Sequence, residues 1–264
     1  MDDIIFSIVV AVYNSEDTIV KCIQSLLAQT FSDYEIIIVD DGCTDNTLIL
    51  IKNFNDEKIT LISDGNNRGP AGARNLGIKN AKGKYVCFTD ADCIVRPEWL
   101  DRFHITYLLN DNIVGVGGIL DPIKHNLIAN LERLKNKKLY KMGDHVYIGK
   151  QDCPIGGTNN LSYKRSVLNE VGGFDETFPK PAGEDFDLKL RICDKGYNLA
   201  YVPVKVYHNQ KYDLEYFLRF IEKRGVPFKL NKKFLLIKIV LLLPIIIPNI
   251  IFKVIKYKIK SKGD

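Results

Sequence analysis

The sequence lacks the features of a disulfide-bonded or secreted protein. Its six cysteines include no C-x-x-C pair, and several lie within apolar or helical patterns. They are therefore expected to be reduced, structural thiols of a cytoplasmic protein. The acidic N-terminus leads directly into an apolar strand pattern, so no signal peptide is expected. The 264 residues contain no internal repeat or low-complexity linker, and they suffice to bury a core in one large domain or two small ones.

The first 222 residues also lack an excess of positive charge. They contain 26 basic and 31 acidic residues, a net charge of −5. This balance argues against a basic stripe, so no nucleic-acid partner is expected. The positive charge is concentrated in residues 223–264, where eleven Lys or Arg accompany one acidic residue.

Apolar runs typical of buried strands alternate with helical patterns in the first third of the chain. The expected strands are 6–12, 35–39, 59–62 and 85–89. Of the helices between them, Ser15 would cap the first, Thr44 or Asp45 would open the second, and the third would cover 71–80. This alternation predicts parallel βαβ units and hence an α/β fold, with a Rossmann-like, mostly parallel sheet and flanking helices.

The pattern is less regular in the rest of the chain. The expected strands there are 113–120 and 201–206, and the expected helices are 98–109, 126–142, one that begins at Ser166, 183–196 and 214–223. The Lys-rich helix at 126–142 has no function that the sequence indicates.

Polar side chains gather in the loops that follow the predicted strands. They are Asn14, Asp40, Asp41, Arg68, Asp90 and Asp92. Right-handed crossovers place these loops at one edge of the sheet, where open α/β folds bind ligands. Asp90 and Asp92 would lie on the same side of an extended chain, close enough to share one hard cation that neutralises a leaving diphosphate. Alone, D-x-D is also typical of a solvated loop, so the surrounding residues decide.

Seven segments, in this order, make the sequence similar to the family 2 glycosyltransferases of the GT-A fold. They are SIVVAVYN (7–14), VDDGCTDNT (39–47), NRGPAGARNLG (67–77), TDADC (89–93), GGTNNLSYKRSVLNEVGGFDE (156–176), GEDFDLKLR (183–191) and VYH (206–208). The resemblance covers residues 4–222. It implies a catalytic domain at 1–222, with a nucleotide-sugar half to about residue 120 and an acceptor half over 121–222.

The resemblance implies a donor in which a diphosphate links a sugar to a nucleoside. Asp40 and Asp41 would contact base or ribose, although both also suit a turn with a helix cap. Arg68 and Arg74 would pair with phosphates, although Arg74 alone is more typical of a surface ion pair. The implied donor-binding residues are Ala11, Val12, Tyr13, Asn14, Asp40, Asp41, Arg68, Arg74, Asp90 and Ala91.

A divalent cation, Mn²⁺ or Mg²⁺, is the cofactor that the resemblance implies. Asp92 would be its direct ligand, Asp90 would contact ribose or metal-bound water, and His208 would be a further ligand. An imidazole ligand favours Mn²⁺ over Mg²⁺. His208 is equally consistent with an ordinary polar loop histidine.

Asp185 is implied as the catalytic base that deprotonates the acceptor hydroxyl. It begins a predicted helix, whose macrodipole would favour the ionised carboxylate. Charge complementarity at a helix end would equally explain Glu184 and Asp185. The residues implied around acceptor and transferred sugar are Gly156, Gly157, Thr158, Asn159 and Glu184.

Two positions depart from the family pattern. Cys43 stands where relatives often carry Ser, and Cys93 stands where a third acidic residue often follows D-x-D. Neither change removes a proposed ligand, so both bear on fine specificity rather than on activity.

Residues 234–252 form a stretch of nineteen with fifteen apolar residues, flanked by lysines on both sides. As one helix it would be about 28 Å long, close to the hydrocarbon thickness of a bilayer. Lys238, Pro244 and Pro248 leave open whether it spans the membrane or lies in the cytoplasmic leaflet. A last helix packed on the domain is the alternative. We expect residues 226–262 to contact membrane lipid on the cytoplasmic face of the cell membrane.

These features predict inverting, metal-dependent sugar transfer to an acceptor hydroxyl on a lipid-linked or cell-surface glycan precursor. One alternative is a polyprenyl-phosphate glycosyltransferase of the same fold. Its acceptor needs no base, and such enzymes resemble only the first half of the pattern. The other is a non-catalytic nucleotide-binding partner subunit, which would not need to keep Asp90, Asp92, Asp185 and His208 together.

Overall fold

A computed structural model describes residues 4–139, 145–178, 183–210 and 212–213. The chain divides into two units, 1–216 and 217–264, and all described residues belong to the first. The predicted helix at 214–223 and the basic, apolar segment 223–264 lie outside the described residues. Within the described part, no helix is long and apolar enough to cross a membrane.

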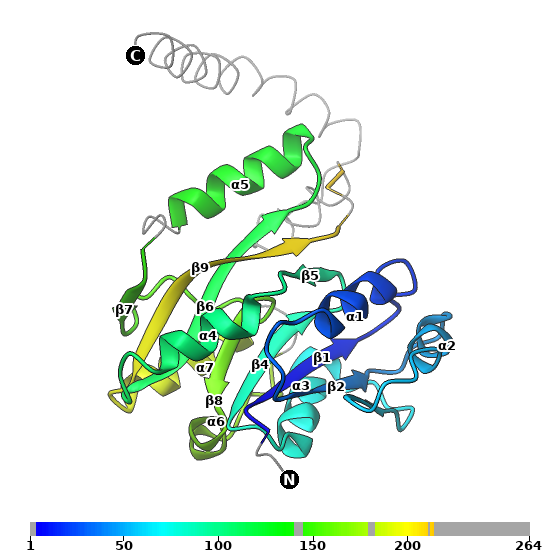
Figure 1. Cartoon of the computed structure of the whole chain (residues 1–264), viewed down its shortest axis with the longest axis horizontal. Helices are drawn as coiled ribbons and strands as arrows, with labels where there is room; N and C mark the ends of the chain where they lie inside the picture. Colours follow the sequence, from blue (N-terminus) through cyan, green and yellow to red (C-terminus); the bar gives the residue numbers. More distant parts are fainter. Residues whose placement is uncertain (1–3, 140–144, 179–182, 211, 214–264) are drawn as a thin grey trace. The chain divides into compact units, whose positions relative to one another are not determined.

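The N-terminal part alternates strands and helices as the sequence predicts (Figure 1). Strand β1 pairs in parallel with both β2 and β4, and β2 pairs in parallel with β3. The register places Val12 beside Asp40 and Ala11 beside Asp90, so these strands end at one edge of the sheet. The elements are β1 (Phe6–Val12), α1 (Ile19–Leu27), β2 (Tyr34–Asp40), α2 (Thr47–Lys52), β3 (Ile59–Ile62), α3 (Gly69–Asn80) and β4 (Tyr85–Asp90).

Two predicted helix starts are wrong by a few residues. The carbonyl of Ser15 accepts hydrogen bonds from the backbone N–H groups of Thr18 and Ile19, which makes a turn before α1. The N-cap of α1 is therefore Thr18, and the Ser15 hydroxyl donates to the Tyr13 carbonyl instead. Helix α2 begins at Thr47 rather than at Thr44 or Asp45.

The C-terminal part contains three short strands that the sequence did not predict. Strands β5, β7 and β8 have only three or four residues each, too few for alternation to emerge from the pattern. The elements are β5 (Cys93–Val95), α4 (Trp99–Tyr107), β6 (Ile113–Pro122), α5 (Leu127–Leu139), β7 (Tyr147–Gly149), β8 (Leu161–Lys164), α6 (Arg165–Val171), α7 (Glu184–Asp194) and β9 (Asn198–His208).

Within the described residues, the strands form one mixed sheet of nine strands. The order is β3-β2-β1-β4-β8-β6-β9-β5, and β7 pairs with β9. Strands β1, β2, β3, β4, β6 and β9 run in one direction, whereas β5, β7 and β8 run against it. The purely parallel arrangement thus holds only from β3 to β4. Reversal of β8 and β5 brings the residues before each of them to the edge where β4 and β9 end.

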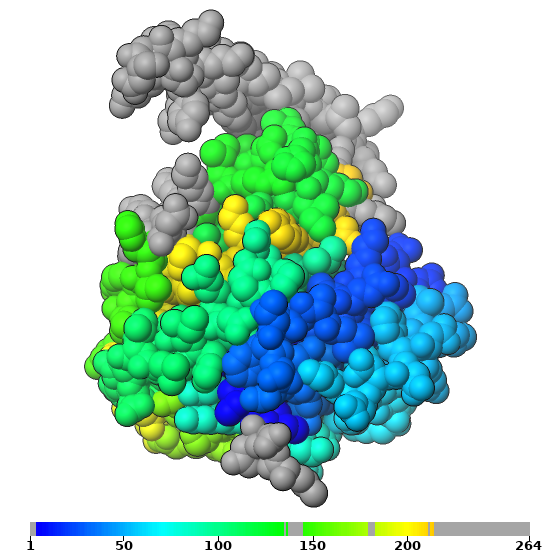
Figure 2. All heavy atoms as spheres, in the orientation of Figure 1, coloured from blue at the N-terminus to red at the C-terminus, as the bar shows by residue number. Residues whose placement is uncertain are grey.

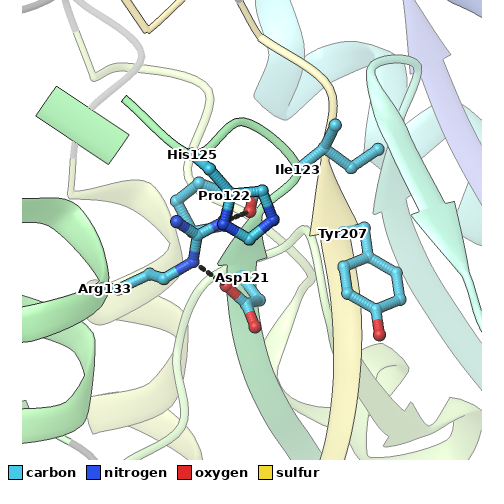
Figure 3. Close-up of a pocket in the computed structure, with 6 residues that line it drawn as sticks. All are labelled: Asp121, Pro122, Ile123, His125, Arg133 and Tyr207. Carbon is cyan, nitrogen blue, oxygen red and sulfur yellow. Dashed lines mark hydrogen bonds and ion pairs between the residues drawn. The ribbon is translucent and has the colours of Figure 1, made fainter. Parts of the chain in front are cut away.

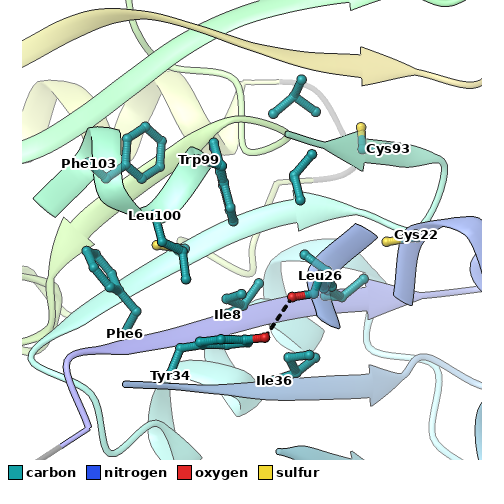
Figure 4. Close-up of a cluster of buried hydrophobic side chains, with 14 of the residues drawn as sticks. Phe6, Ile8, Cys22, Leu26, Tyr34, Ile36, Cys93, Trp99, Leu100 and Phe103 are labelled. Atoms are coloured by element: carbon teal, nitrogen blue, oxygen red, sulfur yellow. Dashed lines mark hydrogen bonds between the residues drawn. The ribbon is translucent and has the colours of Figure 1, made fainter. Parts of the chain in front are cut away.

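Apolar side chains cover both faces of the sheet. Even-numbered residues of β1, such as Phe6 and Ile8, pack with α1 and α4, while Val9 packs with α3, α6 and α7 on the other face. In the first cluster Trp99 lies near Phe103, and the Tyr34 hydroxyl donates to the Leu26 carbonyl at 3.0 Å (Figure 4). Because both faces are buried, the strands are almost continuously apolar and their polar residues lie at the ends.

Candidate active site

Asp92 and His208 come together although 116 positions separate them in the sequence. Antiparallel pairing of β5 with β9 places Cys93 opposite His208, which brings the preceding Asp92 to the end of β9. The Nε2 atom of His208 lies 3.2 Å from Oδ2 of Asp92. The Gln210 side chain donates to the same oxygen at 2.6 Å, and the Asn209 N–H donates to the Asp92 carbonyl at 2.7 Å.

The two side chains stabilise each other's charged form. Burial of Asp92 opposes ionisation, but hydrogen bonds and charge from His208 and the Gln210 amide lower the pKa of its carboxyl. Burial likewise opposes protonation of His208, yet Asp92 and Asp90 raise the pKa of the imidazole. The other ring nitrogen, Nδ1, lies 2.6 Å from the hydroxyl of Tyr212, which fixes the orientation of the ring.

The arrangement fits a divalent cation. Ligand atoms of Asp92, Cys93 and His208 lie within 4.8 Å of one another. Burial, and then the charges of Asp90 and Asp92, raise the pKa of the Cys93 thiol well above its usual value, so it remains a poor ligand. One carboxylate and one imidazole are a donor set that suits Mn²⁺ and leaves positions for oxygen atoms of a diphosphate.

Asp90 faces a different partner from Asp92. The guanidinium of Arg74, on α3, donates from Nη2 to Oδ1 of Asp90 at 3.2 Å and from Nη1 to Oε1 of Glu184 at 3.1 Å. Arg74 and Glu184 are buried, so this bridge links the end of β4 to the start of α7 away from water. Arg74 thus makes two internal ion pairs, and its contact with a phosphate stays a prediction.

Asp185 is half-buried in the first turn of α7, next to Glu184. Its Oδ1 accepts a hydrogen bond from the Phe186 N–H at 2.8 Å. Burial and the charge of Glu184 raise the pKa of the Asp185 carboxyl, against the lowering by that N–H and by Arg74. The macrodipole of α7 was expected to favour the ionised form of Asp185, but burial and the charge of Glu184 outweigh that preference. A raised pKa makes Asp185 a stronger proton acceptor.

Asp40 and Asp41 hold the turn after β2. Oδ1 of Asp40 accepts from the N–H groups of Gly42 and Cys43 at 3.1 and 2.8 Å, and Oδ2 accepts from Ser63. Asp41 Oδ1 accepts from the Arg68 N–H at 2.6 Å, at the start of α3. Both carboxylates thus have the turn-and-cap role that the sequence offered as the alternative. They line the predicted edge, and nucleotide contact by either stays a prediction.

Arg68 and Asn14 lie at the edge that the resemblance assigns to the nucleotide. The Arg68 guanidinium pairs with Asp64, with Nη1 2.7 Å from Oδ1. Asn14 has a positive φ of 45° and accepts from the Thr44 N–H at 2.8 Å, which ties the loop after β1 to the loop after β2. Cys43 accepts a hydrogen bond from the Asn14 N–H at 3.3 Å, so the thiol supports this same contact.

Other predicted donor residues line the end of β1 and the D-x-D turn. Ala11 and Val12 are the last residues of β1, and Val12 is buried. The ring of Tyr13 is 54% exposed, which leaves it accessible to a stacked base. Ala91 is buried in the core between the two aspartates.

The segment 156–160 precedes β8 and lies beside the end of β4. The Thr89 hydroxyl donates to the Asn159 carbonyl at 3.1 Å, and Thr158 is buried. A Cβ at Gly157 would lie 3.0 Å from Oδ1 of Asn159, the end of a side chain in the same turn. Gly156, Gly157, Thr158 and Asn159 thus reach the predicted edge together.

Three residues of the site were not predicted. Asn160 accepts from the Trp99 indole at 2.8 Å and donates to the carbonyls of Ile119 and Val204 at 3.0 Å, which joins β6, β9 and α4. Gln210 and Tyr212 support Asp92 and His208. The doubled asparagine at 159–160 was a visible signal for the first; no sequence pattern distinguished the other two.

The mixed α/β sheet has the GT-A fold of glycosyltransferases, and comparison with known proteins assigns the family. Residues 7–172 match the Glycosyl transferase family 2, and residues 151–236 match the Glycosyltransferase like family 2. The chain therefore belongs to glycosyltransferase family 2 and is a glycosyltransferase.

Curated relatives are glycosyltransferases and polysaccharide-biosynthesis proteins. The UDP-Glc:alpha-D-GlcNAc-diphosphoundecaprenol beta-1,3-glucosyltransferase WfgD of Escherichia coli is 37% identical over 196 residues, which are 73% of this chain and 71% of WfgD. WfaP of Escherichia coli, with the same named activity, is 44% identical over 72% of this chain and 70% of its own. The succinoglycan biosynthesis protein ExoO of Rhizobium meliloti is 46% identical over 80% of this chain and 62% of its own.

Solved structures share the fold at low identity. S. aureus TarS in complex with UDP-GlcNAc gives a TM-score of 0.60 at 19% identity, over 78% of this chain and 59% of that one. The mannosyltransferase PcManGT from Pyrobaculum calidifontis, in complex with GDP-Man and Mn²⁺, gives a TM-score of 0.61 at 19% identity. The match covers 81% of this chain and 59% of that one. The chain spans about three fifths of the length of these two proteins.

Proposed function

We propose that the protein transfers a sugar, with inversion, from a nucleotide-diphosphate sugar to a hydroxyl of a lipid-linked or cell-surface glycan precursor, in a reaction that requires Mn²⁺ or Mg²⁺. The observation that carries this proposal is the Asp92–His208 pair, 3.2 Å apart at the edge where the strands end. Two such ligands from distant segments at this edge suit a metal-bound diphosphate better than a solvated loop.

Asp185 accepts the proton of the acceptor hydroxyl in this mechanism. Its raised pKa favours proton transfer, and such assistance contributes about 10²–10⁴-fold to the rate. The attacking oxygen displaces the diphosphate directly, which inverts the anomeric carbon. Asp92 and His208 would hold the cation, which when bound stabilises negative charge on the departing diphosphate. Arg74 holds Asp90 and Glu184 in register between the two halves.

The relatives support the acceptor class. WfgD and WfaP are named for UDP-Glc as donor and for a diphosphoundecaprenol-linked acceptor sugar, and ExoO is named for succinoglycan biosynthesis. A membrane-associated precursor also agrees with the lysine-flanked apolar stretch at 234–252. We therefore place the enzyme on the cytoplasmic face of the cell membrane, in contact with lipid through residues 226–262.

A polyprenyl-phosphate acceptor is less well supported. A phosphate is already ionised and needs no general base, whereas Asp185 lies half-buried beside Glu184 with a raised pKa. A non-catalytic subunit would have no use for that carboxylate either. A product linked through phosphate would favour the first alternative. Absence of transfer and of donor hydrolysis across all sugars tried would favour the second.

The experiment is a screen of nucleotide-sugar donors with membrane extract as acceptor, with and without Mn²⁺. Transfer that requires the metal and yields a glycosidic bond of inverted configuration is the expected result. Asp185→Asn should lower turnover by about 10²-fold or more while nucleotide affinity changes little. Asp194→Asn, at the other end of α7, is the control and should retain turnover. Full turnover by the Asp185→Asn enzyme would disprove its role as base.

A further inference from the structure

A pocket lies beside the candidate active site. It is formed by helix α5 and by the ends of strands β6 and β9 (Figure 3). Its volume is about 420 Å³, within the range of about 300–1,000 Å³ typical of small-molecule sites. The lining residues are Asp121, Pro122, Ile123, His125, Arg133 and Tyr207. The reaction proposed above uses none of them.

Arg133 and Lys205 bring positive charge to this pocket. Oδ1 of Asp121 lies 2.8 Å from Nε of Arg133, and its Oδ2 lies 3.3 Å from Nζ of Lys205, so two cations share one carboxylate. Arg133 also donates to the side chain of Asn130 and to the Pro122 carbonyl. Among the described residues these bonds use three of the five guanidinium N–H groups, and a guanidinium also suits an oxyanion ligand.

The pocket is next to the candidate metal ligands but separate from them. The β6–β9 register pairs Asp121 with Tyr207 and Pro122 with His208. The Ile123 N–H continues the contact by donating to the His208 carbonyl at 3.1 Å. Because side chains alternate along a strand, Tyr207 and His208 point to opposite faces. A ligand in the pocket would thus approach the reacting edge without occupying the donor site.

Apolar side chains are exposed on Ile123, which lines the pocket, and on α5, the helix that contributes Arg133 to it. Ile123 is 36% exposed, and Leu127 and Leu134 of α5 are 65% and 59% exposed. Leu127 and Leu134 are seven residues apart and therefore share one face of the helix. Figure 2 shows α5 at the surface of the molecule, in green. A cationic pocket beside an exposed apolar helix face suits a ligand with an anionic head and a hydrocarbon chain.

We propose that this pocket binds the diphosphate of a lipid-linked acceptor, with the hydrocarbon chain along Leu127 and Leu134. The inference rests on the proposed function, because it assigns the acceptor of that reaction to a diphosphate-linked lipid. Arg133 and Lys205 supply charge, and a diphosphate held between α5 and the ends of β6 and β9 would extend the attached sugar toward the end of β9.

Calorimetry with decyl diphosphate, below the concentration at which it forms micelles, tests the proposal on the full chain. EDTA is present, so that no cation can bridge the probe to Asp92 and His208. We expect Arg133→Gln and Lys205→Gln to weaken binding by about tenfold or more each. Lys150→Gln is the control. It removes an exposed charge at the opposite edge of the sheet, where β7 ends, and should leave the affinity for decyl diphosphate unchanged. Asp121→Asn should tighten binding, because it removes the competing carboxylate.

Parallel titrations separate head from chain. Inorganic pyrophosphate has the head without the chain and should bind more weakly than decyl diphosphate. Decyl maltoside has the chain without the charged head, so Lys205→Gln should not change its affinity. Equal affinity of all variants, or equal affinity for pyrophosphate and decyl diphosphate, would overturn the assignment. Lys205 is exposed, so Lys205→Gln keeps the proposal testable if Arg133→Gln fails to fold. Failure of sugar transfer with every donor would instead refute the proposed function while leaving this binding result intact.

Discussion

At the scale of single residues, Glu184 controls the environment of the proposed base. It is buried, its Oε1 pairs with Arg74, and its Oε2 has no hydrogen-bond partner within the part of the chain that the structure describes. A buried carboxylate oxygen without a donor is costly, and a sugar hydroxyl would satisfy it. This supports the predicted role of Glu184 near the transferred sugar, and it also places a negative charge beside Asp185.

Glu184→Gln should therefore move the acidic limb of the pH–rate profile to lower pH. Asp185 acts when deprotonated, so the rate falls as pH drops through its pKa, which burial and the charge of Glu184 raise. Removing that charge lowers the pKa and extends activity into more acidic solution. Profiles of kcat/KM are the measurement, and Glu170→Gln, an exposed carboxylate on α6, is the matched control. An unmoved limb would contradict the coupling.

The His208 imidazole offers a second test at this scale. His208→Ala should weaken Mn²⁺ binding. The binding is measured in the presence of UDP, by electron paramagnetic resonance of the Mn²⁺ that stays free. Tyr212→Phe removes the hydroxyl that lies 2.6 Å from Nδ1 of His208. It should lower the Mn²⁺ affinity about tenfold, the lower end of what the hydrogen-bond partners of metal ligands contribute. Tyr197→Phe, which loses a bond to Glu170, should bind normally. Unchanged Mn²⁺ affinity in His208→Ala would show that the imidazole is not a ligand.

At the scale of elements, close packing of α3 on β1 positions both Arg68 and Arg74. Gly77 permits this approach, since a Cβ there would lie 2.3 Å from Cγ1 of Val9. Gly77→Ala should destabilise the protein by about 1–3 kcal/mol, the usual cost of overpacking, despite the higher helix propensity of alanine. Urea unfolding measures the loss. Lys79→Ala on the same helix is exposed and should stay within about 0.5 kcal/mol. Equal midpoints for wild type and Gly77→Ala would refute the close contact.

The elements that could be predicted are those with a long, regular pattern. Strands β1, β2 and β4 are buried on both faces and end abruptly in polar residues, so their bounds and shared edge followed from the sequence. β5, β7 and β8 escaped because they are short, and their pairing depends on partners far along the chain. Asp92 and His208 could be proposed as ligands only through the family resemblance. The bridge that Arg74 makes between Asp90 and Glu184 could not be predicted, because it joins segments that are far apart in the sequence.

At the scale of the whole molecule, charge is divided between an acidic body and a basic C-terminal segment. Residues 1–222 carry a net −5 and residues 223–264 a net +10. A bilayer rich in anionic lipid would attract the second and repel the first, which would orient the enzyme on the membrane surface. The exposed leucines of α5 and the proposed acceptor pocket add a reason for such an orientation, because the acceptor's hydrocarbon chain must remain close to the bilayer.

Neutralising the five lysines at 253, 256, 258, 260 and 262 to Gln should therefore release the full chain from anionic vesicles. Each lysine near such a surface contributes about 1 kcal/mol, so together they account for up to about 5 × 10³-fold in affinity, and for less as salt screens them. Flotation with phosphatidylglycerol vesicles measures the change, and added salt should weaken the wild type in the same direction. Five exposed body lysines changed to Gln, at 21, 52, 79, 82 and 150, form the matched control. They remove the same charge from the part of the chain that the anionic surface repels, so they should weaken binding far less than the tail variant does. Undiminished binding by the tail variant in high salt would mean that the apolar stretch at 234–252 alone anchors the chain, and that charge does not set its orientation.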